Sequence, residues 1–378
     1  MIDQPELPGG RALLTSEALE LLSVAADPFV IESLRCHQAV ARLGETLTVS
    51  YECLISDRNG NHQQRLLVAR AGRKLPAGAV VLSDGSVEVA VWKYPEDPYL
   101  PGLALGLDNR LTKMLSELGL PYPADRVEVR SYLPGRRAVI EVFCGDTRIF
   151  IKAVRPHTVE KLRVLHNSIV GQVTIPTALA WFDEDGLIFF EAMPGETLWE
   201  HLSRGGLGPD PDELIALLDC LPPLAGGPPR LLEQAPSHAR LLSFIAADRS
   251  QELARTIGAL EQTPKEPAVP VHGDLHSGQI ILEEGMIHGL LDVDRAGNGT
   301  RADDLAGLLA HLDSQEAGAD YRNRLWNRFV RLVDRDSLRL RTAAALLGFA
   351  PTPFVSQQPD WPDEVRRRID SAARLARI

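Results

Sequence analysis

The residues best suited to chemistry lie in one segment of the chain. His272-Gly273-Asp274 opens a polar loop that contains Gln279, and Asp292 ends the second of two apolar runs that follow. Phosphoryl transfer from a nucleotide needs a carboxylate that accepts the hydroxyl proton, together with oxygen ligands that hold Mg²⁺ against the phosphates. This segment supplies two carboxylates and an amide oxygen, so it indicates phosphoryl transfer to a hydroxyl group.

The same residues resemble the catalytic signature of the aminoglycoside phosphotransferase family, whose members are related to protein kinases. The family pattern is HGDxxxxN, followed by an aspartate after an apolar strand and then by an Asp-Leu-Ala sequence. In this chain the last element is Asp304-Leu305-Ala306. The resemblance implies that Asp274 is the catalytic base and that Gln279 and Asp292 are metal ligands. It also implies that Asp304 is a structural carboxylate. Gln279 departs from the asparagine of most relatives, and the maltokinase branch also has glutamine there.

Neighbouring side chains allow simpler interpretations. A lone histidine-glycine-aspartate tripeptide would be an ordinary turn, and only the ordered set of elements argues otherwise. His272 is interpreted as a residue that bonds the loop backbone, and His276 as structural. Asp294 would share a face with Asp292 if the strand continued, which makes it a candidate second ligand, although a solvated neighbour is the simpler interpretation.

Lys152 is the candidate for binding phosphate. It stands inside the apolar strand segment 149–153, in a chain where arginine far outnumbers lysine. A compact ammonium group suits the α- and β-phosphates as a point charge, and the resemblance implies this role for Lys152. Glu160 is the only carboxylate between Lys152 and Asp183, so it is the local candidate for an ion pair with Lys152. A glutamate on the helix surface is the alternative.

The segment 132–139 stands where kinase-like folds lay a loop over phosphates. It has no GxGxxG string, but Pro134-Gly135 predicts a tight turn. Main-chain N–H groups at Gly135, or the side chains of Arg136 and Arg137, would then face the nucleotide. A plain hairpin turn with surface arginines is an equally good interpretation.

The segment 189–198 resembles the hinge that joins the two lobes of a kinase. The adenine ring would bond main-chain groups of Glu191 and Met193, and Phe190 would line the pocket. A buried strand that ends in a Pro-Gly turn is compatible with this role.

The elements that must position these residues follow from pattern and turn signals. Alternating residues over 47–55 predict a strand, Asn59-Gly60 predicts a hairpin turn, and a second turn is expected at Asp84-Gly85. One stripe of apolar residues predicts a helix over 103–118, and 127–154 predicts a second β-rich block. A helix is also expected at 157–169. After position 194 the pattern is mainly helical, with helices expected at 214–221, 237–260, 321–333, 338–348 and 362–378.

Composition limits the class of protein. The chain has 378 residues, 44% of them hydrophobic and 24% charged, which is typical of a globular protein. The net charge of −11 argues against a nucleic-acid partner, and no apolar run is long enough to span a membrane. Four widely separated cysteines without a CxxC pair are expected to be buried thiols in a reducing compartment. A cytoplasmic location is therefore expected.

Together these features predict an α+β, bilobal, protein-kinase-like fold. Residues 1–121 are expected to form an extra small α+β cap, 122–193 an antiparallel nucleotide-binding lobe, and 194–378 a mainly helical lobe with the acceptor site. The predicted activity is transfer of a γ-phosphate, with Mg²⁺, from ATP or alternatively GTP. The predicted acceptor is a hydroxyl group of a sugar, amino sugar or aminoglycoside-like compound. The alternative function is a nucleotide-binding pseudokinase that assists a biosynthetic complex.

Overall fold

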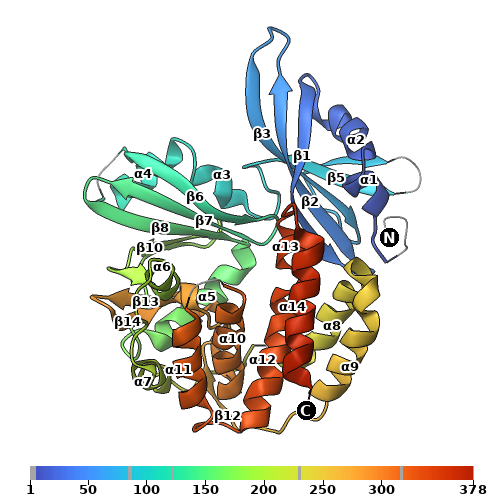
Figure 1. Ribbon diagram of the computed structural model, residues 1–378. Helices are drawn as coiled ribbons and strands as arrows, with labels where there is room; N and C mark the ends of the chain where they lie inside the picture. Colours follow the sequence, from blue (N-terminus) through green and yellow to red (C-terminus); the bar gives the residue numbers. More distant parts are fainter. Residues whose placement is uncertain (1–5, 84–86, 121–122, 229–230, 316–317, 378) are drawn as a thin grey trace. The chain divides into compact units, whose positions relative to one another are not determined.

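A computed structural model of the protein describes residues 6–83, 87–120, 123–228, 231–315 and 318–377. The chain forms two units (Figure 1). The first contains Met1–Glu160, Thr177–Ala192 and Phe354–Pro359. The second contains Lys161–Pro176, Met193–Pro353 and Asp360–Ile378. One of the points at which the chain passes from one unit to the other lies between Ala192 and Met193, inside the segment predicted to be a hinge.

The first sheet of the first unit has five antiparallel strands in the order β1-β2-β3-β5-β4. The predicted hairpin is confirmed, since β2 pairs with β3 around Asn59-Gly60. The apolar residues of β2 that alternate from Leu47 to Ile55 are all buried. Thr48 and Ser50 on the opposite face are buried too, so the first half of β2 is buried on both faces, whereas the alternation predicted burial on one face. The turn expected at Asp84-Gly85 lies outside the described residues. The strands, and two preceding helices that were not predicted, are α1 (Gly10–Leu14), α2 (Glu17–Ala26), β1 (Val30–Arg42), β2 (Thr46–Ser56), β3 (His62–Gly72), β4 (Val80–Ser83) and β5 (Glu88–Lys93).

The second sheet of this unit also has five antiparallel strands, in the order β6-β7-β8-β10-β9. Its apolar side packs against two short helices, α3 (Pro101–Leu105) and α4 (Arg110–Glu117). The single helix predicted over 103–118 is wrong, because α3 ends at Leu105 and the Asp108 side chain accepts the N–H of Arg110, where α4 begins. The strands are β6 (Arg126–Leu133), β7 (Arg137–Cys144), β8 (Thr147–Val154), β9 (Ala178–Phe182) and β10 (Leu187–Glu191). A 3₁₀ turn, η1 (Pro156–Thr158), and helix α5 (Val159–Ile169) follow β8.

The second unit is mainly helical, as predicted for this part of the chain. Its strands are β11 (Glu196–Thr197), β12 (Ala268–Val271), β13 (Ile280–Glu283), β14 (Met286–Leu290) and β15 (Gly297–Thr300). Its helices are α6 (Leu198–Ser203), α7 (Pro211–Asp219), α8 (Leu231–Ile245), α9 (Ser250–Leu260), α10 (Arg301–Asp313), α11 (Ala319–Phe329), α12 (Arg335–Phe349) and α14 (Trp361–Ala376), with 3₁₀ turns η2 (Ala247–Arg249), η3 (Ser277–Gln279) and η4 (Val293–Arg295). The short helix α13 (Thr352–Val355) precedes α14. The predicted helix over 237–260 is interrupted by η2, and α10 was not predicted.

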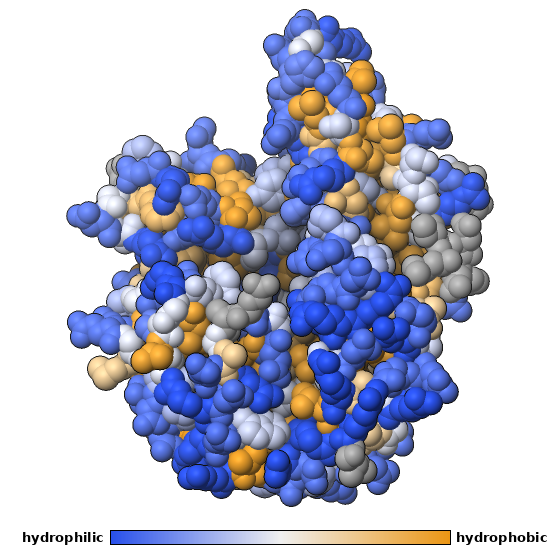
Figure 2. All heavy atoms as spheres, viewed as in Figure 1, coloured by the Kyte–Doolittle hydropathy of each residue, from blue (hydrophilic) through white to orange (hydrophobic). Residues whose placement is uncertain are grey.

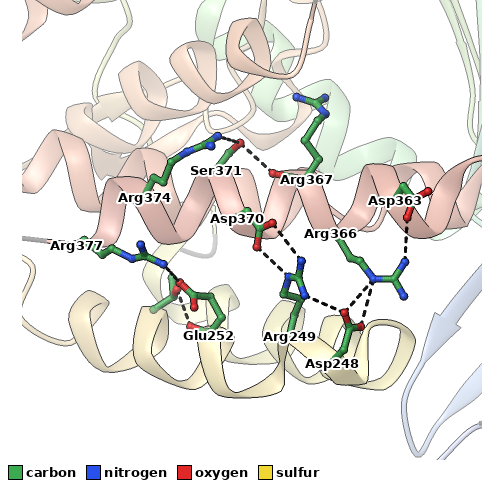
Figure 3. A network of polar contacts seen from close by, with 11 residues as sticks. Asp248, Arg249, Glu252, Asp363, Arg366, Arg367, Asp370, Ser371, Arg374 and Arg377 are labelled. Carbon is green, nitrogen blue, oxygen red and sulfur yellow. Dashed lines mark hydrogen bonds and ion pairs between the residues drawn. The ribbon is translucent and has the colours of Figure 1, made fainter.

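Helix α14 is attached to η2 and α9 by charged side chains (Figure 3). Arg249 Nε lies 2.9 Å from Asp370 Oδ1, and Arg366 Nε lies 3.0 Å from Asp248 Oδ2. These pairs are partly exposed, whereas Ile369 on the same helix is completely buried. The viewed surface over α14 is correspondingly hydrophilic (Figure 2). Burial of apolar residues therefore stabilises this contact more than the ion pairs do.

The cysteines are all free thiols, but not all are buried. Cys53 and Cys144 are buried as expected, Cys36 is half-buried, and Cys220 is exposed. The expectation of burial is wrong for Cys220 because it follows the end of α7, where the helix reaches the surface. In the part of the chain that the structure describes, we find no helix with the length and apolarity needed to cross a membrane.

Candidate active site

The polar loop at 272–279 connects β12 with β13, and Gly273 sets its direction. Gly273 has φ +80°, a conformation that side chains disfavour. A Cβ atom at this position would lie 2.4 Å from the carbonyl oxygen of Arg295. Only glycine allows the loop to approach residue 295 this closely. Because Asp274 is the next residue, this close approach also positions Asp274.

A buried carboxylate on α10 holds the start of this loop. Asp304 is 2% exposed, and its two oxygens accept the main-chain N–H groups of His272 at 2.7 Å and Gly273 at 2.8 Å. Burial raises the pKa of Asp304, and the two N–H donors oppose this rise. Asp304 is thus a structural carboxylate, as predicted.

His272 holds the other side of the loop. The side chain is completely buried, and its Nε2 lies 2.8 Å from the carbonyl oxygen of Leu291. Its Nδ1 accepts the N–H of Asp274 at 3.3 Å, so a neutral ring with a proton on Nε2 satisfies both contacts. The prediction that His272 bonds the backbone is confirmed. The imidazole joins the Asp274 loop to the segment that contains Asp292.

The two residues predicted as metal ligands lie on adjoining segments. The N–H of Leu291, next to Asp292, donates to the main-chain oxygen of Gln279 at 2.8 Å. Asp292 has φ +51° and directly precedes η4, while β14 has already ended at Leu290. The strand therefore does not continue to Asp294, and the condition for Asp294 to share a face with Asp292 is not met.

Asp274 lines a cavity of about 210 Å³ in the second unit. Arg295 Nη1 is 3.9 Å from Asp274 Oδ1. Helix α8 contributes His238 to the wall, and α12 contributes Phe349. Burial lowers the pKa of His238, so this imidazole is neutral at pH 7. These wall residues were not found from the sequence, because no motif marks them and they come from separate helices.

A second carboxylate at this cavity is already neutralised. Asp303 on α10 lines the cavity and forms an ion pair with Arg341, whose side chain is 5% exposed. Arg341 also donates from Nε to Ser337 Oγ at 3.1 Å. Asp304, the third carboxylate at the cavity, is buried and accepts two N–H groups, so Asp274, with its single long contact to Arg295, is the most accessible carboxylate here.

His276 belongs to a ring stack beside the loop. Its ring is stacked on His311 with centroids 4.7 Å apart, and the edge of Phe349 meets His311 at 5.7 Å. His276 Nδ1 accepts the N–H of Gly278, and Ser277 Oγ lies 3.0 Å from His311 Nδ1. Burial, and after it the neighbouring His276, lowers the pKa of His311 to about 4. The structural interpretation of His276 agrees with these contacts.

The predicted nucleotide-binding residues Lys152 and Glu160 lie in the first unit. Lys152 is on β8, paired in register with Val139 of β7 and Ile188 of β10, and is 8% exposed. Glu160 is exposed in the first turn of α5. Lys152 is therefore a buried lysine inside a sheet, and its binding of phosphate stays a prediction. The ion pair between Lys152 and Glu160 stays a prediction.

The turn between β6 and β7 contains Gly135 and Arg136. The N–H of Gly135 donates to Asp97 Oδ2 at 2.7 Å, and the N–H of Arg136 donates to the carbonyl oxygen of Leu133 at 2.9 Å. Both N–H groups already have acceptors within the protein, which argues against the predicted binding of phosphate by these main-chain groups. The side chain of Arg136 is exposed and stays a candidate.

The predicted hinge residues are divided between the units. Phe190 on β10 meets Trp181 edge to face at 6.1 Å, and the N–H of Glu191 donates to the carbonyl oxygen of Thr177. An adenine contact to Glu191 would therefore use its carbonyl oxygen. Met193 lies in the second unit, where its Cε is 2.6 Å from the position that a Cβ on Gly289 would take. Glycine at 289 thus makes room for Met193.

Comparison with known proteins agrees with this geometry. The model of the phosphotransferase enzyme family matches residues 155–341, which include the 272–279 loop, Asp292 and Asp304. No curated protein matches the chain. The match confirms the resemblance to this family and the predicted enzyme class, a phosphotransferase.

Solved structures of low sequence identity share the fold. The apo form of a thermostable mutant of aminoglycoside phosphotransferase APH(4)-Ia has a TM-score of 0.52 and 15% identity, covering 69% of this chain and 97% of that one. A ternary complex of a thermostable mutant of the same enzyme with AMP-PNP and hygromycin B has a TM-score of 0.52 and 15% identity, covering 71% and 99%. These similarities confirm the predicted α+β, kinase-like fold class. Assignment to the maltokinase branch stays a prediction.

Proposed function

We propose that this chain is an ATP- and Mg²⁺-dependent phosphotransferase that transfers the γ-phosphoryl group to a hydroxyl group of a small molecule. The observation that supports this most directly is the position of Asp274. Its carboxylate lines a cavity, on a loop held by Asp304 and by the ring of His272. The complex of the similar phosphotransferase with AMP-PNP and hygromycin B supports a nucleotide and a small-molecule acceptor as the two substrates.

In this proposal Asp274 orients the acceptor hydroxyl and takes its proton during transfer. Phosphoryl transfer depends mainly on positioning and on neutralising charge, so a rigid loop under the base is a catalytic requirement. The contacts of Asp304 and His272 supply that rigidity. Arg295, whose guanidinium is 3.9 Å from Asp274, lines the same cavity.

Gln279 and Asp292 would hold Mg²⁺. Carboxylate and amide oxygens are the ligands this ion prefers, and it commonly binds to one or two carboxylates plus substrate phosphates. The described residues contain no group of three or more His, Cys, Asp or Glu side chains arranged for a metal. A Mg²⁺ site whose remaining ligands are phosphate oxygens does not require such a group. When bound, Mg²⁺ neutralises charge on the phosphates. The donor set therefore fits the ion.

Lys152 is proposed to bind the α- and β-phosphates, with either ATP or GTP as the donor. The Lys152→Ala variant should bind nucleotide more weakly by calorimetry. Lys161→Ala is the matched control, because Lys161 is an exposed lysine on α5. Equal nucleotide affinity in Lys152→Ala and in the control would remove Lys152 from the site.

The charge of the cavity favours an uncharged, hydroxyl-rich acceptor such as a sugar. Asp303 is neutralised by Arg341, Arg295 lies beside Asp274, and His238 is uncharged at pH 7. A polycationic aminoglycoside would be bound best by several open carboxylates, since charge complementarity gives specificity. We therefore expect sugars to be phosphorylated more efficiently than aminoglycosides.

The test is phosphate transfer from ATP and GTP to a panel of sugars, amino sugars and aminoglycosides. Asp274→Asn should lose nearly all turnover and keep its nucleotide affinity. Asp294→Asn is the matched control, a nearby aspartate outside the proposed set, and should retain activity. Substantial turnover by Asp274→Asn would refute its role as the base. Nucleotide binding by the wild-type protein without transfer to any acceptor, and without Mg²⁺-dependent ATP hydrolysis, would support the pseudokinase alternative.

A further inference from the structure

A buried carboxylate from the N-terminal part of the chain holds the turn between β6 and β7. Asp97 follows β5 and is only 2% exposed. Its Oδ2 accepts the N–H of Gly135 at 2.7 Å and the O–H of Tyr132 at 2.8 Å, while Oδ1 accepts the N–H of Tyr99 at 2.9 Å. Burial, and after it the Asp97 carboxylate, raises the pKa of Tyr132, so the phenol stays protonated and donates. Asp97 thus joins segments 38 residues apart.

Arg155 binds the opposite polar group of the same glycine. Its Nε and Nη2 donate to the carbonyl oxygen of Gly135 at 2.8 and 2.6 Å. The guanidinium also lies 4.6 Å from the centroid of the Tyr99 ring, a cation–π contact. Arg155 directly follows β8, the strand that carries Lys152. The turn is therefore tied both to the N-terminal segment and to the end of the lysine-bearing strand.

The space around the turn admits glycine alone. Gly135 has φ +67°, and a Cβ atom there would lie 2.9 Å from Tyr99 Cδ2. The Tyr99 ring therefore occupies the space that a Cβ at position 135 would take. Asp97 accepts the N–H of Gly135, and Arg155 donates to its carbonyl oxygen. We call Asp97, Tyr99, Gly135 and Arg155 the turn clamp.

Burial of the Asp97 carboxylate is unfavourable for folding, so a purely structural role does not explain why a carboxylate stands here. In the described part of the chain no lysine, arginine or histidine forms an ion pair with Asp97, and its hydrogen-bond donors are the neutral groups Tyr99 N–H, Tyr132 O–H and Gly135 N–H. Burying an unpaired carboxylate costs free energy, whereas a neutral acceptor would cost less. The two oxygens of Asp97 accept three hydrogen bonds from three different segments, and this geometry holds the turn rigidly.

We propose that Asp97 is a positioning residue for nucleotide binding. This inference rests on the proposed function, in which Lys152 on β8 binds the nucleotide phosphates; the turn acts through Arg155 and the end of β8, not through its own N–H groups. The turn clamp makes the 133–136 turn and the end of β8 a single preformed element. A site that is already ordered loses less conformational freedom when ligand binds, so its affinity is higher. Residues 1–121, predicted to be a cap, would then support nucleotide affinity through Asp97.

Asp97→Asn tests the proposal, because one amide oxygen cannot accept all the N–H and O–H groups that the carboxylate accepts. We expect the Kd for ATP, measured by calorimetry, to rise about five- to tenfold, the size of the loss of one typical net hydrogen bond. The KM for the acceptor should stay within about twofold of the wild type. Hydrogen exchange at the Gly135 amide should become faster even without nucleotide. Asp108→Asn is the matched control: Asp108 also accepts a main-chain N–H, but on an exposed turn of the same unit.

Arg155→Lys is the second variant, because lysine cannot make the two parallel contacts to the Gly135 carbonyl. It should weaken ATP binding with the same unchanged acceptor KM, and it tests the clamp even if Asp97→Asn fails to fold. ATP affinity within twofold of the wild type in the folded variants would overturn the positioning role. A wild-type protein that binds no nucleotide at all would instead refute the proposed function, so the two failures are distinguishable.

Discussion

Replacing Asp304 by asparagine is the sharpest test of how the catalytic loop is held. The two carboxylate oxygens accept the N–H groups of His272 and Gly273, and asparagine has only one oxygen to offer. One N–H would face an NH₂ group, and an unsatisfied buried donor costs about 1–3 kcal/mol. Because burial raises the pKa of Asp304, removal of its charge offsets part of this cost. We expect a net loss of about 1–2 kcal/mol in the free energy of unfolding.

The Asp304→Asn substitution should also lower kcat, because it loosens the loop that carries Asp274. A misplacement of about 1 Å can reduce a rate by roughly 100-fold, so we expect kcat to fall about 10- to 100-fold. Denaturant unfolding, hydrogen exchange at the amides of His272 and Gly273, and kcat should be measured on the same preparation. Asp313→Asn is the control on the same helix, since its ion pair with Arg322 is at the surface and should contribute less than about 1 kcal/mol. Wild-type kcat and unchanged amide exchange in Asp304→Asn would refute the argument.

Two further predictions concern stability. Burial lowers the pKa of His311 to about 4 in the folded protein, against an ordinary value of 6.5. The stability that comes from a neutral His311 is therefore present above pH 6.5 and is lost as the pH falls towards 4, by about 2 kcal/mol at pH 5. Unfolding free energies at pH 7.5 and pH 5 should show a smaller decrease for His311→Asn than for the wild type, and equal decreases would contradict the assignment. For α14, Ile369→Ala should cost about 2–5 kcal/mol in the free energy of unfolding, and Arg249→Ala should cost clearly less because its ion pair is exposed to solvent. Denaturant unfolding compares the two variants, and an equal or larger loss from Arg249→Ala would show that the ion pairs of Figure 3 dominate the contact.

The features predicted correctly from the sequence are those encoded by neighbouring residues. Alternation over 47–55 and the Asn59-Gly60 turn specify the β2–β3 hairpin because side chains alternate between the faces of a strand. The order of residues around Asp274 identified the loop that now lines a cavity. Helix α10 was missed although it contains Asp304, because it is buried on most sides and lacks an apolar stripe.

The tertiary structure decided which groups meet. Asp304 reaches His272 across 32 residues, and Asp97 reaches Gly135 across 38. No periodicity links such positions, since their partners are chosen by how sheets and helices pack. The cavity wall likewise combines His238 from α8 with Phe349 from α12. Local pattern therefore determined the elements and the chemistry of the loop, and long-range packing determined what holds the loop in place and what surrounds it.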